Sequence, residues 1–190
     1  MEEALVRRLQ AGDEEAFDAL FALYRMQAVR TAALITGDAS LAEDVAQEAF
    51  VQCLLHIKEL RAPSCFRPWF FRTLTRCAWK SMQEKLPSVD WNNALEQAAV
   101  SESYPSEKAA VYEKLYRALD GLGRKQRTTV ILYYFNDLSI KEIAQVTGSL
   151  EGTVKTRLFA ARRRLKQVLE ADEQKGEVVK KLFFNIPSLK

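Results

Sequence analysis

Residues 139–158 read Ser-Ile-Lys-Glu-Ile-Ala-Gln-Val-Thr-Gly-Ser-Leu-Glu-Gly-Thr-Val-Lys-Thr-Arg-Leu, and this stretch decides the fold. It opens with a capping box: the Ser139 hydroxyl can accept from the backbone N–H of Glu142, whose carboxylate can reach back to Ser139. A short helix follows, and Gly148 ends it because glycine adopts the positive φ of a helix C-terminus at little cost. The pattern therefore predicts a short helix and then a tight turn.

Ser149 is positioned to cap a second helix over about 150–169. One face of this helix is apolar at helical spacing and is expected to pack on a core. The other face is small, polar and basic, as a helix that enters the major groove of DNA requires. We interpret the segment as a helix-turn-helix that binds duplex DNA, and the alternative is a helical hairpin with a cationic solvent face. The predicted DNA contacts are Thr153, Lys155, Thr156, Arg157, Arg162 and Arg163.

The rest of the chain also predicts helices, and no alternating strand pattern or hairpin dipeptide is seen. Gly37 and Pro63 interrupt the helical pattern, and a stretch rich in Pro, Ser and Asn has the composition of a linker. The expected fold is all-α, with two small helical domains joined by a flexible linker and followed by a short extension. The expected boundaries are 1–85 for the first domain, 86–106 for the linker, 107–170 for the second domain and 171–190 for the C-terminal extension.

The net charge of the 190-residue chain is only +3, but it is unevenly distributed. Residues 61–85 hold 6 Lys/Arg against 1 acidic residue, and residues 121–170 hold 10 against 4. Residues 1–60 are acidic, with 5 Lys/Arg against 11 Asp/Glu. Two basic blocks favour two separate contacts with a polyanion, although solvated helix faces would give the same counts.

Several functional classes are excluded by what the sequence lacks. There is no secretory signal and no apolar run of the roughly 18 residues that a membrane span needs, so we expect a cytoplasmic protein with no direct membrane insertion. Three scattered cysteines and one histidine do not form a disulfide framework or a metal site. No Gly-rich phosphate loop is present. We therefore expect no enzyme activity, no cofactor and no metal.

Three motifs together resemble the extracytoplasmic-function (ECF) class of RNA polymerase sigma factors. The runs 133–144, 151–158 and 160–165 look like region 4, which reads the minus-35 element of a promoter. Ala42-Glu-Asp-Val-Ala-Gln-Glu-Ala-Phe-Val51 resembles region 2.2, which docks on the clamp of the largest polymerase subunit. Phe66-Arg-Pro-Trp-Phe-Phe-Arg-Thr-Leu74 is similar to the start of the region that reads and melts the minus-10 element. The resemblance covers nearly all of residues 10–170.

The resemblance implies roles for individual residues. Core RNA polymerase and promoter DNA are the implied partners, together with an anti-sigma factor that holds the protein inactive. Acidic and amide groups on one helical face suit a basic partner helix, which agrees with the polymerase contact. The implied polymerase contacts are Asp44, Gln47 and Glu48, and the implied minus-10 contacts are Arg61, Arg67, Arg72, Arg76 and Lys80.

The chain departs from the family pattern on the helix that reads the minus-10 element. That helix usually carries an Asn, then Asp and Arg on later turns, where this chain has Arg76, Lys80 and Gln83. The basic residues can still contact DNA phosphates, but these substitutions put the usual recognition of minus-10 bases in doubt. A stand-alone helix-turn-helix regulator and a diverged accessory subunit that no longer reads the minus-10 element therefore stay open. For 171–190, an apolar face at helical spacing suggests docking on the protein's own domains or on a partner.

Overall fold

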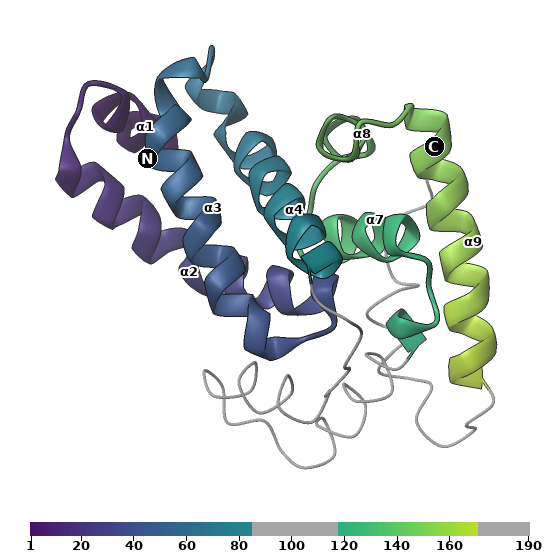
Figure 1. Ribbon diagram of the computed structural model, residues 1–190. Helices are drawn as coiled ribbons and strands as arrows, with labels where there is room; N and C mark the ends of the chain where they lie inside the picture. Colours follow the sequence, from purple (N-terminus) through teal and green to yellow (C-terminus); the bar gives the residue numbers. More distant parts are fainter. Residues whose placement is uncertain (85–117, 171–190) are drawn as a thin grey trace.

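The computed structural model describes residues 1–84 and 118–170, and the expected linker and C-terminal extension lie outside these residues. All regular structure within the described residues is helical, which confirms the all-α fold (Figure 1). No described helix is long and apolar enough to cross a membrane. We call residues 1–84 the N-terminal group and residues 118–170 the C-terminal group.

The N-terminal group is a bundle of four helices around an aromatic core. Tyr24, Phe50 and Phe70 lie at its centre, and the ring centroids of Phe50 and Phe70 are 4.9 Å apart. The long second helix starts at Asp13, whose carboxylate accepts from two backbone N–H groups, and stops at Gly37 with φ 76°. The helices are α1 (Glu2–Gln10), α2 (Glu14–Thr36), α3 (Ala42–His56) and α4 (Phe66–Glu84), with short 3₁₀ turns at Ala39–Leu41, Ile57–Glu59 and Pro63–Cys65.

The C-terminal group contains the expected helix-turn-helix. Both bonds of the capping box are present, since the Ser139 hydroxyl accepts from Glu142 N–H and the Glu142 carboxylate accepts from Ser139 N–H. Gly148 has φ 59° at the end of the short helix. These features confirm the predicted capping box and turn. The helices are α7 (Arg124–Tyr134), α8 (Ile140–Thr147) and α9 (Glu151–Glu170).

The expected cap at Ser149 is wrong. Helix α9 begins at Glu151, and its first intrahelical bond runs from Val154 N–H to the Leu150 carbonyl. Ser149 lies one residue too early to cap this helix. Its hydroxyl instead donates to the Thr147 carbonyl and accepts from the Arg157 guanidinium, so it braces the turn between the two helices.

We expect Ser139→Ala to lower the free energy of unfolding by about 1 kcal/mol, because it removes the cap of α8. Urea unfolding followed by circular dichroism measures the change. Ser64→Ala is the matched control, since Ser64 is exposed in the 3₁₀ turn Pro63–Cys65 and that turn has no side-chain cap. Equal stability of the two variants would show that the capping box does not stabilise the motif.

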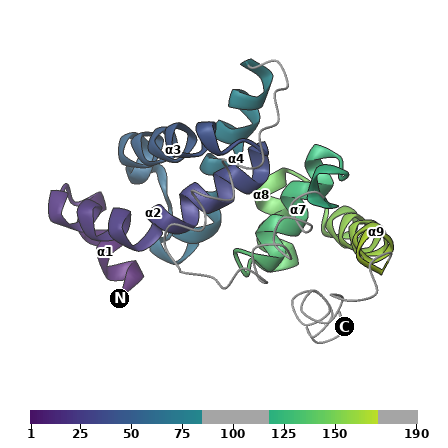
Figure 2. The same cartoon turned by 90° about the horizontal axis from the view of Figure 1, so that it is seen from below.

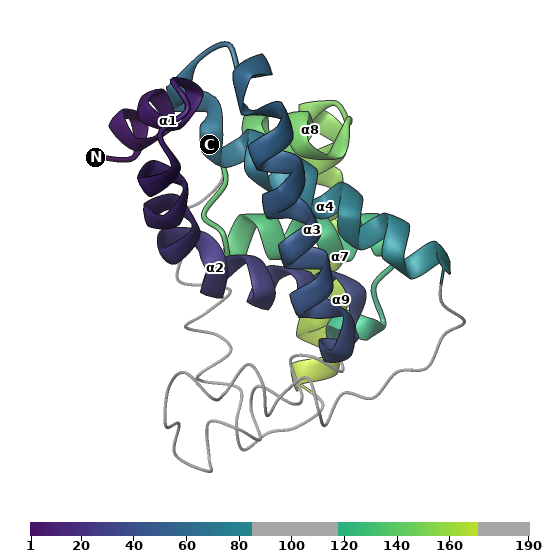
Figure 3. The same cartoon turned by 60° about the vertical axis from the view of Figure 1, so that its left-hand side comes forward.

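The two groups pack against each other. Helix α4 lies between α3 on one side and α7 and α8 on the other, as Figures 1 and 3 show from two directions. Helix α2 also contacts α7. The buried apolar residues of the two groups form one continuous cluster. Seen from below in Figure 2, α1 and α9 lie at opposite ends of this body.

Candidate nucleic-acid interface

The outer face of α3 carries the three residues that the sequence assigned to a protein partner. Asp44, Gln47 and Glu48 are all exposed, and Asp44 and Glu48 also border the groove between α3 and α4. The Glu48 carboxylate accepts from Gln52 Nε2 one turn further along, at 2.8 Å. The structure therefore presents these groups together on one helix, pointing to solvent.

An apolar row extends this face toward the C-terminus of α3, and sequence reasoning missed it. Val51, Leu54 and Leu55 are 50%, 48% and 66% exposed. They follow Asp44 and Gln47 at helical spacing, so they share the outward side. The row could have been predicted from the sequence. Once the buried face of α3 has been assigned by helical periodicity, these three large apolar residues fall on the opposite, exposed face. Exposed apolar residues beside acidic ones are typical of a protein-docking surface.

Helix α4 carries the basic block predicted to contact DNA. Arg72, Arg76 and Lys80 are exposed along it, and Arg61 is exposed just before the turn that leads into it. Arg67 differs from them. It is half-buried, and its Nη2 donates to the backbone carbonyl of Asn136 at 2.6 Å, across the boundary between the two groups.

A groove of about 740 Å³ runs between α3 and α4. Its α3 wall is acidic, with Asp44 and Glu48, and its α4 wall is basic, with Arg76 and Lys80. The carboxylates at the groove lie on the α3 wall. The part of the chain that the structure describes holds no group of three His, Cys, Asp or Glu residues suited to a metal ion. The groove thus separates the surface suited to a basic protein helix from the one suited to nucleic acid.

Helix α9, which the sequence predicts to be a recognition helix, turns its polar face outward. Thr153, Lys155, Thr156 and Arg163 are exposed there. Its opposite face is buried against α7 and α8. Phe159 is 70% exposed, and sequence reasoning missed it. At one turn from both Lys155 and Arg163, it adds an apolar group to the basic face.

Two of the predicted DNA contacts on α9 have partners within the protein. Arg157 Nη1 donates to the Ser149 hydroxyl at 2.8 Å. Arg162 donates through Nε to the hydroxyl of Tyr134, and its guanidinium lies over the rings of Tyr133 and Tyr134. Burial raises the pKa of the Tyr134 hydroxyl, and the bond from Arg162 acts in the opposite direction. Both arginines are part-buried, so they fix the orientation of α9 as well as adding charge to it.

Comparison with known proteins bears on both groups. Residues 20–84 match the family model "Sigma-70 region 2", and residues 112–165 match "Sigma-70, region 4". The chain is 31% identical over 154 residues to the ECF RNA polymerase sigma factor SigM of Bacillus subtilis, covering 78% of this chain and 92% of SigM. It is 29% identical over 181 residues to the RNA polymerase sigma-H factor of Pseudomonas aeruginosa, covering 89% of this chain and 94% of that protein.

Two solved structures share the fold. One is CnrH in complex with the cytosolic domain of CnrY, with a TM-score of 0.70, 22% identity, and coverage of 90% of this chain and 98% of the other. The second is RpoE of Bartonella quintana in complex with the anti-sigma factor NepR, with a TM-score of 0.65 and 22% identity. The match covers 82% of this chain and 98% of the other. The two helical groups of this chain thus correspond in fold to whole chains of known structure.

Proposed function

The chain belongs to the ECF class of sigma-70 RNA polymerase sigma factors, and from this we propose how its surfaces divide promoter-specific transcription initiation between them. The outer face of α3 binds core polymerase, α4 with the preceding turn engages the minus-10 region, and α9 binds the minus-35 element. The two groups correspond to regions 2 and 4 of the family, and the proposed domains keep the boundaries 1–85 and 107–170.

The exposed face of α3 is the observation that supports this division best. A stand-alone helix-turn-helix regulator needs only α7–α9 and has no use for an acidic and apolar face on a second helical group. The polymerase contacts we propose are Asp44, Gln47 and Glu48, extended by Val51, Leu54 and Leu55. Carboxylates beside an apolar row suit a partner helix that presents arginines and apolar side chains.

Binding to core RNA polymerase tests the proposal. Purified chain is mixed with purified core enzyme and passed through a gel-filtration column. Co-elution with the core is the expected result. A chain that elutes alone at micromolar concentration, while still binding duplex DNA, would favour a stand-alone regulator instead.

We propose that the minus-10 contacts are Arg61, Arg72, Arg76 and Lys80, with Arg67 joining them when its bond to Asn136 is broken. Arginine and lysine provide phosphate contact without reading sequence. At the minus-35 element, Thr153 and Thr156 lie at the N-terminal end of α9, where recognition helices meet base edges, and Lys155 between them contacts the phosphate backbone. Arg157, Arg162 and Arg163 add positive charge along the same helix.

We expect Lys155→Ala to weaken binding to duplex DNA and to reduce the slope of log K against log salt by about 0.9, because one phosphate contact is lost. Fluorescence anisotropy between 50 and 200 mM salt measures both quantities. Arg7→Ala removes the same charge from α1, at the opposite end of the molecule (Figure 2), and should leave both unchanged. Equal slopes for the two variants would contradict the assignment of α9.

We also propose an anti-sigma factor as a partner, since RpoE of Bartonella quintana, which shares the fold, is in complex with one. The site of action that we propose is the cytoplasm, where polymerase and promoter DNA are found. No catalytic step is assigned to the chain, because sigma factors act by binding and by opening DNA.

A further inference from the structure

Gln10, the last residue of α1, holds the chain between α3 and α4, residues 57–65, which we call the connecting segment. Its side-chain Nε2 donates to the Ile57 carbonyl at 3.1 Å and to the Leu60 carbonyl at 2.8 Å. A glutamine amide has two N–H donors, so both are used here. The Leu60 backbone N–H also donates to the Ile57 carbonyl, at 3.2 Å. A residue 47 and 50 positions away in sequence therefore binds the connecting segment at two points.

The connecting segment has little regular structure of its own. It contains two 3₁₀ turns, Ile57–Glu59 and Pro63–Cys65, and neither has a side-chain cap. Short 3₁₀ turns have poor hydrogen-bond geometry, and their backbone groups need other partners. Ile57 and Leu60 are buried, but apolar burial has no direction, whereas a hydrogen bond does. The two bonds from Gln10 therefore orient a backbone that burial alone would leave free to turn.

Helix α1, which also contacts both 3₁₀ turns, is itself a fixed support. Val6 and Leu9 are buried in the core, and the Tyr24 hydroxyl of α2 donates to the Glu2 carboxylate at 2.7 Å. Burial, and after it the bond to Glu2, raise the pKa of Tyr24, so the hydroxyl stays a donor at neutral pH. The Tyr24 ring also lies 5.5 Å from that of Phe66, the first residue of α4, centroid to centroid. Both ends of the connecting segment are thus held by the α1–α2 pair.

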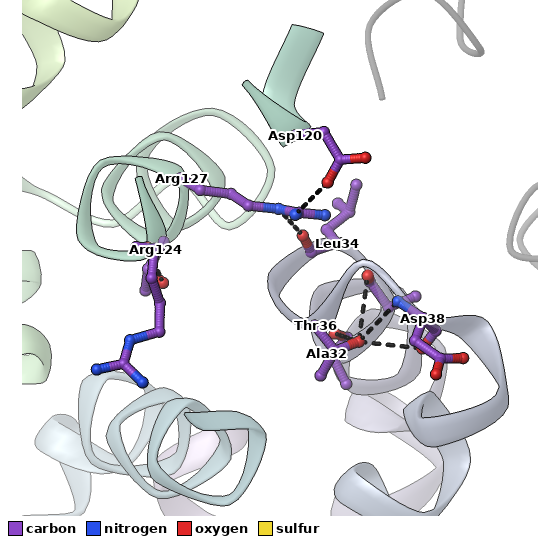
Figure 4. Close-up of polar contacts among 9 residues, drawn as sticks. Ala32, Leu34, Thr36, Asp38, Asp120, Arg124 and Arg127 are labelled. Atoms are coloured by element: carbon purple, nitrogen blue, oxygen red, sulfur yellow. Dashed lines mark hydrogen bonds and ion pairs between the residues drawn. The ribbon is translucent and has the colours of Figure 1, made fainter. Parts of the chain in front are cut away.

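Helix α2 is fixed at its C-terminal end as well, as Figure 4 shows. In its last turn the Thr36 hydroxyl donates to the Ala32 carbonyl at 2.9 Å and accepts from the Asp38 N–H at 3.2 Å. The Leu34 carbonyl accepts from Arg127 Nε of α7 at 2.6 Å. A helix leaves its last carbonyls without intrahelical donors, so these bonds keep the last turn from fraying. Its N-terminus is capped too, so the helix on which α1 packs is held at both ends.

The outward side of the connecting segment is cationic and polar. Lys58, Arg61 and Ser64 are exposed on it, and Arg61 is one of the proposed minus-10 contacts. Its single acidic residue, Glu59, lies with its carboxylate 2.8 Å from Nδ1 of His56. A single DNA strand is bound by cationic groups that follow its backbone. Groups that are held in place beforehand lose less conformational entropy when the strand binds, so an ordered connecting segment favours capture of the unpaired minus-10 strand.

We propose that Gln10 is a positioning residue for promoter opening, because it holds the connecting segment in the shape that captures the minus-10 strand. Gln10 binds two backbone carbonyls and acts on the DNA only through the connecting segment. Without its two bonds the segment adopts other shapes, and a smaller fraction of molecules is ready to take up the strand. The inference rests on the proposed function, in which α4 with the preceding turn engages the minus-10 region. It adds a helix to that function, since α1 lies outside the residues 20–84 that match region 2.

Two variants of the full chain remove the donors of Gln10 in different ways. Gln10→Met keeps an unbranched side chain of similar length but has no N–H group, and Gln10→Glu keeps the shape but only accepts at neutral pH. Gln27→Met and Gln27→Glu are the matched controls, because Gln27 is a half-buried glutamine of α2 that makes neither bond to the connecting segment. The two replacements differ in charge, so an effect that both share comes from the lost donors.

Amide hydrogen exchange of the free chain tests the two bonds without any DNA. The amides of residues 57–65 should exchange about 10-fold faster in both Gln10 variants than in the wild type, because two hydrogen bonds of the ordered segment are lost. The Gln27 variants should exchange at these positions as the wild type does.

The rate of open-complex formation tests the functional step. Holoenzyme is made with core RNA polymerase, a promoter is identified by run-off transcription, and opening is followed with a fluorescent adenine analogue in the minus-10 element. The rate should fall about 5- to 10-fold in both Gln10 variants. Affinity for core polymerase and for a minus-35 duplex should stay within about twofold of the wild type. A general loss of structure would lower all of these quantities, so this split identifies a positioning role.

Three results would overturn the proposal. In the first, residues 57–65 exchange in the Gln10 variants as in the wild type, so the bonds do not hold the connecting segment. In the second, exchange is faster but the promoter opens at the rate of the Gln27 controls. In the third, affinity for core polymerase falls by the same factor as the opening rate. If the wild type itself opens no promoter, the proposed function fails instead, and the exchange measurement still decides whether Gln10 holds the connecting segment.

Discussion

Reversing two charges on α3, by Asp44→Lys with Glu48→Lys, should weaken binding to core RNA polymerase by about 30- to 100-fold, or roughly 2–3 kcal/mol. Both carboxylates are exposed on the outer face of the helix, so their loss leaves the core of the bundle unchanged. The reversed charges would repel the basic partner helix that the acidic face suits. Fluorescence titration of labelled protein with core enzyme measures the change.

A matched reversal on α2 separates this effect from net charge. Glu14→Lys with Asp18→Lys makes the same change in charge at two exposed positions of α2, and it should alter the affinity by less than about threefold. Thermal melts of both variants show whether each remains folded. If the α2 reversal weakened binding as much as the α3 reversal, the effect would come from overall charge and the α3 face would not be the docking site.

Phe70→Ala should lower the free energy of unfolding by about 4 kcal/mol, because it removes a fully buried ring from the centre of the N-terminal group. The Phe70 ring lies between 4.9 and 5.9 Å from those of Phe50, Tyr24, Phe71 and Phe66, centroid to centroid. Both walls of the α3–α4 groove depend on this packing. Urea unfolding measures the loss.

Phe159→Ala makes the same substitution at an exposed position on α9. Its free energy of unfolding should change by less than about 0.5 kcal/mol, while its affinity for duplex DNA should fall, since Phe159 lies among the basic residues of the recognition face. A loss of stability in Phe159→Ala comparable to that in Phe70→Ala would show that the aromatic core does not dominate the stability of the fold. Unchanged DNA affinity would remove Phe159 from the interface.

The elements set by local chemistry were predictable from the sequence. The Ser139–Glu142 capping box and the turn at Gly148 depend on residues a few positions apart, and both are present. The exposure of Asp44 and of Lys155 also followed from helical periodicity. At Ser149 the same reasoning failed by one residue, because its hydroxyl is taken by the turn and by Arg157.

The packing of the two groups could not be predicted in this way. The bond between Thr31 and Asn136 joins residues 105 positions apart, and that between Leu34 and Arg127 joins residues 93 apart. No periodicity in one helix specifies a partner at that distance. The basic block of α4 shows the consequence, since its sequence does not distinguish Arg67, which is bonded to the Asn136 carbonyl, from exposed Arg72.

Run-off transcription tests the central claim most directly. Purified core polymerase is supplied with a library of genomic promoter fragments, with and without the wild-type chain. The account predicts new transcripts that start at defined positions downstream of a shared pair of minus-35 and minus-10 sequences, and that are lost with the α3 charge reversal. The opposite result, a chain that binds core polymerase and duplex DNA but directs no new transcript, would contradict the assignment of promoter-specific initiation to this protein.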